Sequence, residues 1–122
     1  MRFMSHAVDI HDRIFRFVTR GLKVLPFLPK TIESKIIIDQ YARSLTSVGA
    51  NDNEADGVST SNDFIHIYTI VRKELKEVRY WLRIIAELFP LLAPRLINLI
   101  QESEELIRII STIIANTKKS QK

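Results

Sequence analysis

The sequence has 122 residues, of which 46% are hydrophobic and 26% charged, and its formal net charge is +4. This length fits one domain with a real core, and the apolar content excludes intrinsic disorder. With 3 glycines and 4 prolines, the chain has too few turn formers for an all-β protein. The absence of cysteine excludes disulfides, thiolate metal sites and cysteine nucleophiles.

Apolar residues recur every three or four positions over four stretches, which is the period of amphipathic helices. The first stretch runs from about residue 6 to 25, and Pro26 ends it. The second runs over 32–54, with Thr31 as its N-cap. A polar run over 51–62 then predicts the one long connection of the chain.

The third stretch, 61–89, carries a heptad seam, because its apolar residues alternate between spacings of four and three. The seam consists of Phe64, Tyr68, Val71, Leu75, Val78, Leu82, Ile85 and Phe89. The fourth stretch, 92–117, has Pro94 in its first turn, and we expect residues 118–122 to fray. These stretches predict an all-α fold, an antiparallel four-helix bundle with up-down-up-down topology, as one domain over 1–122.

Helices three and four carry more apolar surface than one bundle core requires, because each has a second apolar row. The surplus predicts a homo-oligomer, although a deeply buried helix pair inside a single chain would account for the same pattern. The candidate interface residues are Trp81, Ile84, Leu88, Ile97, Ile100, Ile107 and Ile114.

Five short segments between residues 36 and 85 carry a family resemblance. They are Gln40–Asn51, Glu54-Ala55, Ser61–Ile65, Lys73-Glu74-Leu75 and Tyr80-Trp81-Leu82. Together they resemble the bacterial four-helix-bundle family whose founding members are encoded by intervening sequences inside large-subunit ribosomal RNA genes. The commonest sequence of the family has Ile-Ala-Glu-Gly at the end of the second helix. This chain has Gly49-Ala50-Asn51 and Glu54-Ala55 instead, a variation that still fits one subgroup of the family.

The resemblance implies a ring-like homopentamer. A related branch of the family acts as the accessory protein of diversity-generating retroelements, in which a basic pentamer binds the reverse transcriptase and nucleic acid. The resemblance therefore implies three kinds of candidate partner. They are further copies of the chain, RNA or DNA, and a reverse transcriptase.

Two helices each carry a stripe of basic residues at helical spacing. The first stripe consists of Arg13, Arg16, Arg20 and Lys23, and the second of Arg72, Lys76, Arg79 and Arg83. Such spacing suits the phosphates of a nucleic-acid strand, to which arginine gives bidentate contacts. Solvation of an exposed helix face is the alternative explanation, and Lys73 and Glu77 are placed to form an i,i+4 pair.

Several polar groups are candidates for metal binding or catalysis. Asp52, Glu54, Asp56, Gly57 and Asp63 partly match a calcium-loop template, and the alternative is a solvated acidic connection. A carboxylate-bridged metal bundle needs two E-x-x-H pairs, whereas this chain offers one related pair, Asp63-x-x-His66. The family resemblance places Asn51 and Glu54 near the end of the second helix, where they could be a binding pair that faces a pore. The alternative is that Asn51 ends the helix and that Glu54 is solvated or pairs with a nearby basic residue. We expect no metal, no cofactor and no enzymatic activity.

No secretory signal pattern follows the first residues, and no uncharged run approaches the roughly twenty residues of a membrane span. We therefore expect a cytoplasmic protein without a membrane partner. The leading functional prediction is a non-enzymatic homo-oligomeric scaffold or adaptor, pentameric, with a basic surface for nucleic acid. The alternative is a retroelement accessory protein, and the distant alternative is a calcium- or metal-binding module.

Overall fold

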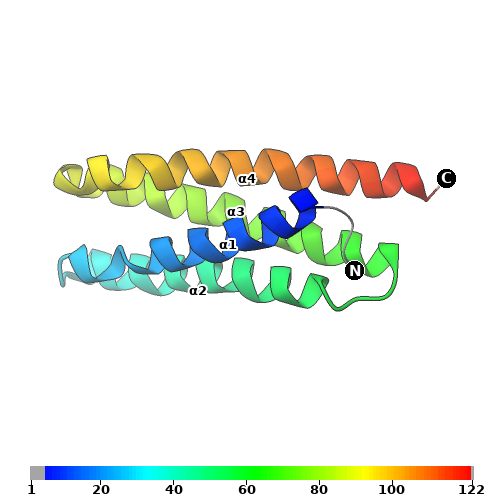
Figure 1. The fold of residues 1–122 in the computed structure, drawn as a ribbon. Coiled ribbons are helices and arrows are strands. Elements are labelled where there is room, and N and C mark those ends of the chain that lie inside the picture. Colours follow the sequence, from blue (N-terminus) through cyan, green and yellow to red (C-terminus); the bar gives the residue numbers. More distant parts are fainter. Residues whose placement is uncertain (1–4, 122) are drawn as a thin grey trace.

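The computed structural model describes residues 5–121, which form four α-helices and no strand. The helices are α1 (Ser5–Leu22), α2 (Ile32–Ala55), α3 (Ser61–Leu88) and α4 (Ala93–Ser120), as Figure 1 shows. Short 3₁₀ helices, η1 (Leu25–Phe27) and η2 (Pro90–Leu92), lie in two of the connections. The all-helical prediction is confirmed.

The four helices run alternately up and down along one bundle axis (Figure 1). The α1–α2 and α3–α4 connections lie at one end of the bundle, and the α2–α3 loop lies at the other. We call the first of these the connection end. Helix α3 packs against both α2 and α4, and the shorter α1 closes the bundle against the same two helices.

The heptad seam of α3 lies at the centre of the core. Its members from Phe64 to Ile85 are all buried, and Phe89, just past the helix, is half-buried. On α4 the facing row is buried as well, including the polar Ser103, whose hydroxyl donates to the carbonyl of Ile100 at 2.6 Å. The buried members of these two rows are therefore apolar or, in the case of Ser103, internally satisfied.

Helix α1 ends at Leu22, earlier than the expected residue 25, and the chain continues into η1. Pro26 has no N–H to donate to the carbonyl of Leu22, so the α-helical ladder cannot continue there. Just before this end, Tyr41 of α2 donates to the carbonyl of Gly21 at 2.8 Å. A Cβ at Gly21 would lie 2.6 Å from Leu45, so this glycine allows α1 and α2 to approach closely.

The segment 118–122 was expected to fray; its residues up to 121 are described, and Lys122 lies outside the described residues. The helix continues to Ser120, and Lys118 and Lys119 in its last turn suit the negative end of the helix dipole. Gln121 also donates to the side-chain oxygen of Asn62 at 2.7 Å, which ties this end of α4 to the start of α3.

Glu74 of α3 is a carboxylic acid that is only 5% exposed. Its Oε2 atom has no hydrogen-bond partner within residues 5–121, and the carboxyl group is hydrogen-bonded to Glu77. Burial first, and the charge of Glu77 second, raise the pKa of Glu74 above its ordinary 4.5. A proton on Glu74 allows it to donate to the Glu77 carboxylate, which also lies 3.6 Å from Arg43.

We expect Glu74→Gln to increase the free energy of unfolding at neutral pH, because an amide keeps a donor toward Glu77 and has no charge to bury. A raised folded-state pKa means that the contribution of Glu74 is fully present below its unfolded pKa and is lost as the pH rises through the folded pKa. Urea unfolding measured from acidic to neutral pH should show this loss in the parent and a weaker one in the variant.

The matched control is Glu87→Gln, which removes an exposed carboxylate from the same helix. This control should keep the pH dependence of the parent. A Glu74→Gln variant with the parent's stability and pH dependence would contradict the protonated carboxyl pair.

Candidate nucleic-acid interface

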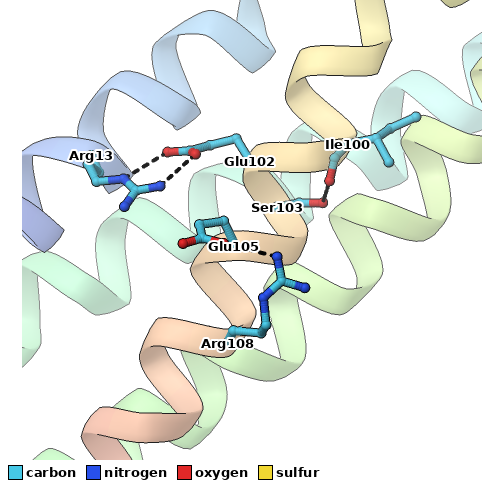
Figure 2. Close-up of polar contacts among 6 residues, drawn as sticks. All are labelled: Arg13, Ile100, Glu102, Ser103, Glu105 and Arg108. Carbon is cyan, nitrogen blue, oxygen red and sulfur yellow. Dashed lines mark hydrogen bonds and ion pairs between the residues drawn. The ribbon is translucent and has the colours of Figure 1, made fainter.

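The first half of the α1 stripe is engaged in ion pairs. Arg13 makes a two-pronged contact with Glu102 of α4, from Nε to Oε2 at 3.1 Å and from Nη2 to Oε1 at 2.7 Å (Figure 2). Arg16 lies 2.6 Å from Asp12, one helical turn earlier. Arg13 and Glu102 are both largely covered, whereas Arg16 and Asp12 are exposed. Arg13 is therefore fixed in place, and Arg16 is held only by a weak surface pair.

A groove of about 680 Å³ lies beside these pairs, between α1 and α4. Its arginines are Arg13, Arg16 and Arg108, and the last of these pairs with Glu105 at 2.9 Å (Figure 2). The remaining lining residues are Ile10, Ile109, Thr112, Ile113 and Asn116. We call this the side groove. Every arginine that lines it has an acidic partner, so it offers little uncompensated positive charge.

The second half of the α1 stripe reaches a different cavity, at the connection end. This end pocket has a volume of about 230 Å³ and lies between the end of α1, η1 and the start of α4. Three of its lining residues are basic, namely Arg20, Lys23 and Arg95, and none is acidic. The other lining residues are Val24, Phe27, Leu92, Leu96 and Leu99. Among the side chains that the structure describes, residues 10–121, no carboxylate forms an ion pair with any of the three cations.

Arg95 was not among the residues predicted from the sequence. Its guanidinium carbon lies 4.2 Å from the centroid of the Phe27 ring, which is a cation–π contact. The sequence indicated this position only indirectly. Arg95 follows Pro94 in the first turn of α4, and antiparallel packing brings that turn to the end of α1. The structure therefore joins half of a predicted stripe to a cation from a distant part of the sequence.

The residues of the α3 stripe differ in how far they are covered, and one of them contacts α4. Arg72 and Arg79 are half-buried, and Lys76 and Arg83 are exposed. Arg72 donates to the hydroxyl of Ser111 at 3.3 Å. In the part of the chain that is described, no member of this stripe forms an ion pair with a carboxylate. The stripe is therefore only partly on the water face that the sequence predicted, and its charge is uncompensated.

A polar network joins α1, α2 and α3, and sequence reasoning missed it. Asp52 is buried and accepts from Tyr68 at 2.6 Å and from Nδ1 of His11 at 2.9 Å. The other ring nitrogen of His11 faces Asp56 at 3.7 Å. Burial, followed by the charge of Asp52, raises the pKa of Tyr68, so its phenol remains a donor. The partners of His11 are carboxylates rather than a nucleophile, which suits a structural link between helices.

This network also corrects the calcium-loop alternative. Asp52 and Glu54 lie within α2, so the first template positions are helical, and the Asp52 carboxylate is committed to His11 and Tyr68. Within the described residues, no three His, Cys, Asp or Glu side chains gather where they could hold a metal ion. Asn51 donates to the carbonyl of Ser47 at 2.9 Å and does not end the helix, and Glu54 is exposed.

The structure divides the candidate interface residues into two groups. Ile107 and Ile114 are 8% and 3% exposed and belong to the core of the chain itself, so these two have almost no surface left for a neighbour. Their burial in the helix pair is the alternative that the sequence left open. Leu88 and Ile97 are 47% and 51% exposed, and Trp81, Ile84 and Ile100 are half-buried.

Comparison with known proteins places this arrangement in a family. The model of the 23S rRNA-intervening sequence protein family matches residues 6–112. The chain belongs to this family. The match confirms the resemblance found in the sequence and extends it over α1 and most of α4. No curated protein matches the chain significantly.

A solved crystal structure is similar in fold to this family member. It is of a protein with unknown function from the S23 ribosomal protein family of Bacteroides thetaiotaomicron. The two chains are 28% identical, with a TM-score of 0.78 over 86% of this chain and 97% of the other. The family and its fold are thus established, while the solved relative brings no activity with it.

A helix that spans a membrane must be both long and apolar. In the described range, no single helix is both long and apolar enough to cross a membrane. The pair Ser61–Leu88 and Pro90–Ser120, which is bent by 116° at its break, meets the length and composition requirements only when taken together.

We expect Tyr68→Phe to lower the free energy of unfolding by about 1–3 kcal/mol, because it leaves a buried carboxylate without its shortest hydrogen bond. Tyr80→Phe is the matched control, since Tyr80 is 56% exposed on the same helix, and it should change stability by at most about 0.5 kcal/mol. Chemical denaturation of both variants tests the difference. Equal effects would show that Asp52 does not depend on Tyr68.

Proposed function

We propose that this family member is a non-enzymatic protein that assembles with copies of itself and binds nucleic acid through phosphate contacts. The observation that carries the proposal is the set of basic side chains without an acidic partner among residues 5–121. From the two predicted stripes this set contains Arg20, Lys23, Arg72, Lys76, Arg79 and Arg83, and Arg95 joins it.

Phosphate is the anion that suits these cations best. The members of the two stripes lie on helix faces at three- and four-residue spacing, and most of the set are arginines, which can contact phosphate oxygens in pairs. Each phosphate that is neutralised releases condensed counterions, so several such contacts give a large, salt-dependent affinity without base-specific contacts. Cations already paired with carboxylates, such as Arg13, would contribute less because the existing pair must first be broken.

Self-association is the second part of the proposal. Leu88 and Ile97 expose about half of their surface, and Trp81, Ile84 and Ile100 of the same two helices are half-buried. Exposed apolar side chains on neighbouring helices can form a surface that binds another protein. A ring of five copies is the assembly that the family resemblance implies. Repetition of the basic faces around a ring would convert weak phosphate contacts into multivalent binding.

The phosphate contacts are tested by neutralising partnerless cations. We expect Lys76→Gln with Arg79→Gln and Arg83→Gln to weaken binding to RNA and DNA of any sequence. The slope of log affinity against log salt should fall by about 0.7 to 0.9 for each phosphate that the variant no longer neutralises. Fluorescence anisotropy with mixed-sequence strands and duplexes, at about 50 to 200 mM salt, measures both quantities.

The control for this experiment changes the net charge by the same amount. It combines Arg16→Gln, Arg43→Gln and Arg108→Gln, three arginines that have acidic partners. The control should retain more affinity and a steeper salt slope than the first variant. Equal losses of affinity in both variants, or no binding by the parent at low salt, would contradict the proposed phosphate contacts.

Self-association is tested by the mass of the particle in solution. Light scattering of the parent should give about five times the 14.2 kDa of one chain. Leu88→Gln with Ile97→Gln should shift the mass toward a single chain, because both changes place amides on the exposed apolar surface. Phe15→Gln, at an exposed position on α1, should not shift the mass. A parent mass of one chain would rule out this part of the proposal.

A further inference from the structure

The end pocket differs from the side groove in a way that points to a specific ligand. The side groove is larger, but each of its arginines is paired with an acid. The end pocket is smaller, and its three cations have no acidic partner among the described residues. Of these two cavities, the end pocket alone combines uncompensated positive charge with an apolar interior.

Phe27 adds an aromatic surface to this pocket. Phe27, the last residue of η1, is 50% exposed, and the Arg95 guanidinium lies 4.2 Å from the centroid of its ring. Exposed aromatic rings beside arginines are the feature on which proteins stack unpaired bases, while nearby cations follow the strand's phosphates. The other walls are aliphatic and suit the faces of a base rather than a hydrated anion.

We infer that the end pocket takes one unstacked base of a single-stranded nucleic acid, with the flanking phosphates on Arg20, Lys23 and Arg95. This inference rests on the proposed nucleic-acid binding and adds the kind of strand that is preferred. A volume of about 230 Å³ is below the roughly 300–1,000 Å³ of sites for drug-sized ligands, which suits a group no larger than one base.

A duplex cannot use the pocket in the same way. Its bases are stacked on one another, so their faces are covered, and only its phosphates can reach the three cations. Taking a base out of the stack would carry an energetic penalty. The protein should therefore bind a single strand more tightly than a duplex of the same sequence, and the difference should depend on Phe27.

The test compares Phe27→Leu with the parent on three labelled probes of about 12 nucleotides, a length within the site sizes of single-strand-binding folds. The probes are a mixed-sequence single strand, its blunt duplex, and a strand of the same length that lacks bases. Phe27→Leu should weaken binding of the single strand by roughly 5- to 100-fold, the effect of removing one base–aromatic stack. Binding of the duplex and of the baseless strand should change by less than about 2-fold, since neither stacks a base on Phe27.

Two further variants make the result specific. Phe15→Leu makes the same change at an exposed phenylalanine that lies outside the lining of both cavities, and it should leave all three affinities unchanged. Arg20→Gln with Lys23→Gln and Arg95→Gln should weaken binding of every probe, because all three probes carry phosphates. Thermal unfolding and light scattering of each variant show whether fold and assembly are retained.

The outcomes separate this inference from the proposed function. If Phe27→Leu leaves the preference for single strands unchanged while the triple variant weakens binding of all probes, nucleic-acid binding stands and the base pocket is overturned. If no probe binds the parent at low salt, both fail. A lower particle mass for Phe27→Leu would assign the pocket to contact between copies of the chain and also overturn the inference.

Discussion

The apolar seam along α3 fixes where α2 and α4 lie, and α1 packs in turn against those two helices. Its residues at alternating spacings of four and three are buried from Phe64 to Ile85, and both α2 and α4 pack against the same helix. Burial of a leucine- or isoleucine-sized side chain contributes about 1.5–3 kcal/mol, whereas an exposed ion pair contributes at most about 1 kcal/mol. The seam therefore determines the geometry, and the charged side chains occupy the positions that this geometry leaves for them.

Much of the fold was predictable because helical periodicity is a local property. The spacing of apolar residues predicted four helices, and the seam from Phe64 to Ile85 is buried as expected. The ends were less predictable, since Pro26 shortens α1 and Asn62 holds the end of α4. The burial of Ile107 could not be predicted from the sequence. A second apolar row shows which face of α4 is apolar, but not whether this chain or another copy covers that face.

The candidate site was predictable only in part, because pairing depends on the height and rotation of one helix relative to another. Arg13 and Glu102 are 89 positions apart, and nothing local to either indicates a contact. The same holds for His11 and Asp52, which are 41 positions apart. Sequence spacing grouped Arg13 with Arg20 on one stripe, whereas packing gave the first a carboxylate partner and left the second beside Arg95 and Phe27.

The up-and-down path of the chain determines how the protein can be tethered to a surface or fused to another protein. The α1–α2 and α3–α4 connections share one end of the bundle, and the last turn of α4 lies at the opposite end (Figure 1). The last residue of α4, Ser120, stands roughly 32–38 Å along the helix from Leu99 and Arg95 in the end pocket. Molecules anchored through the last turn of α4 would therefore keep the end pocket away from the point of attachment.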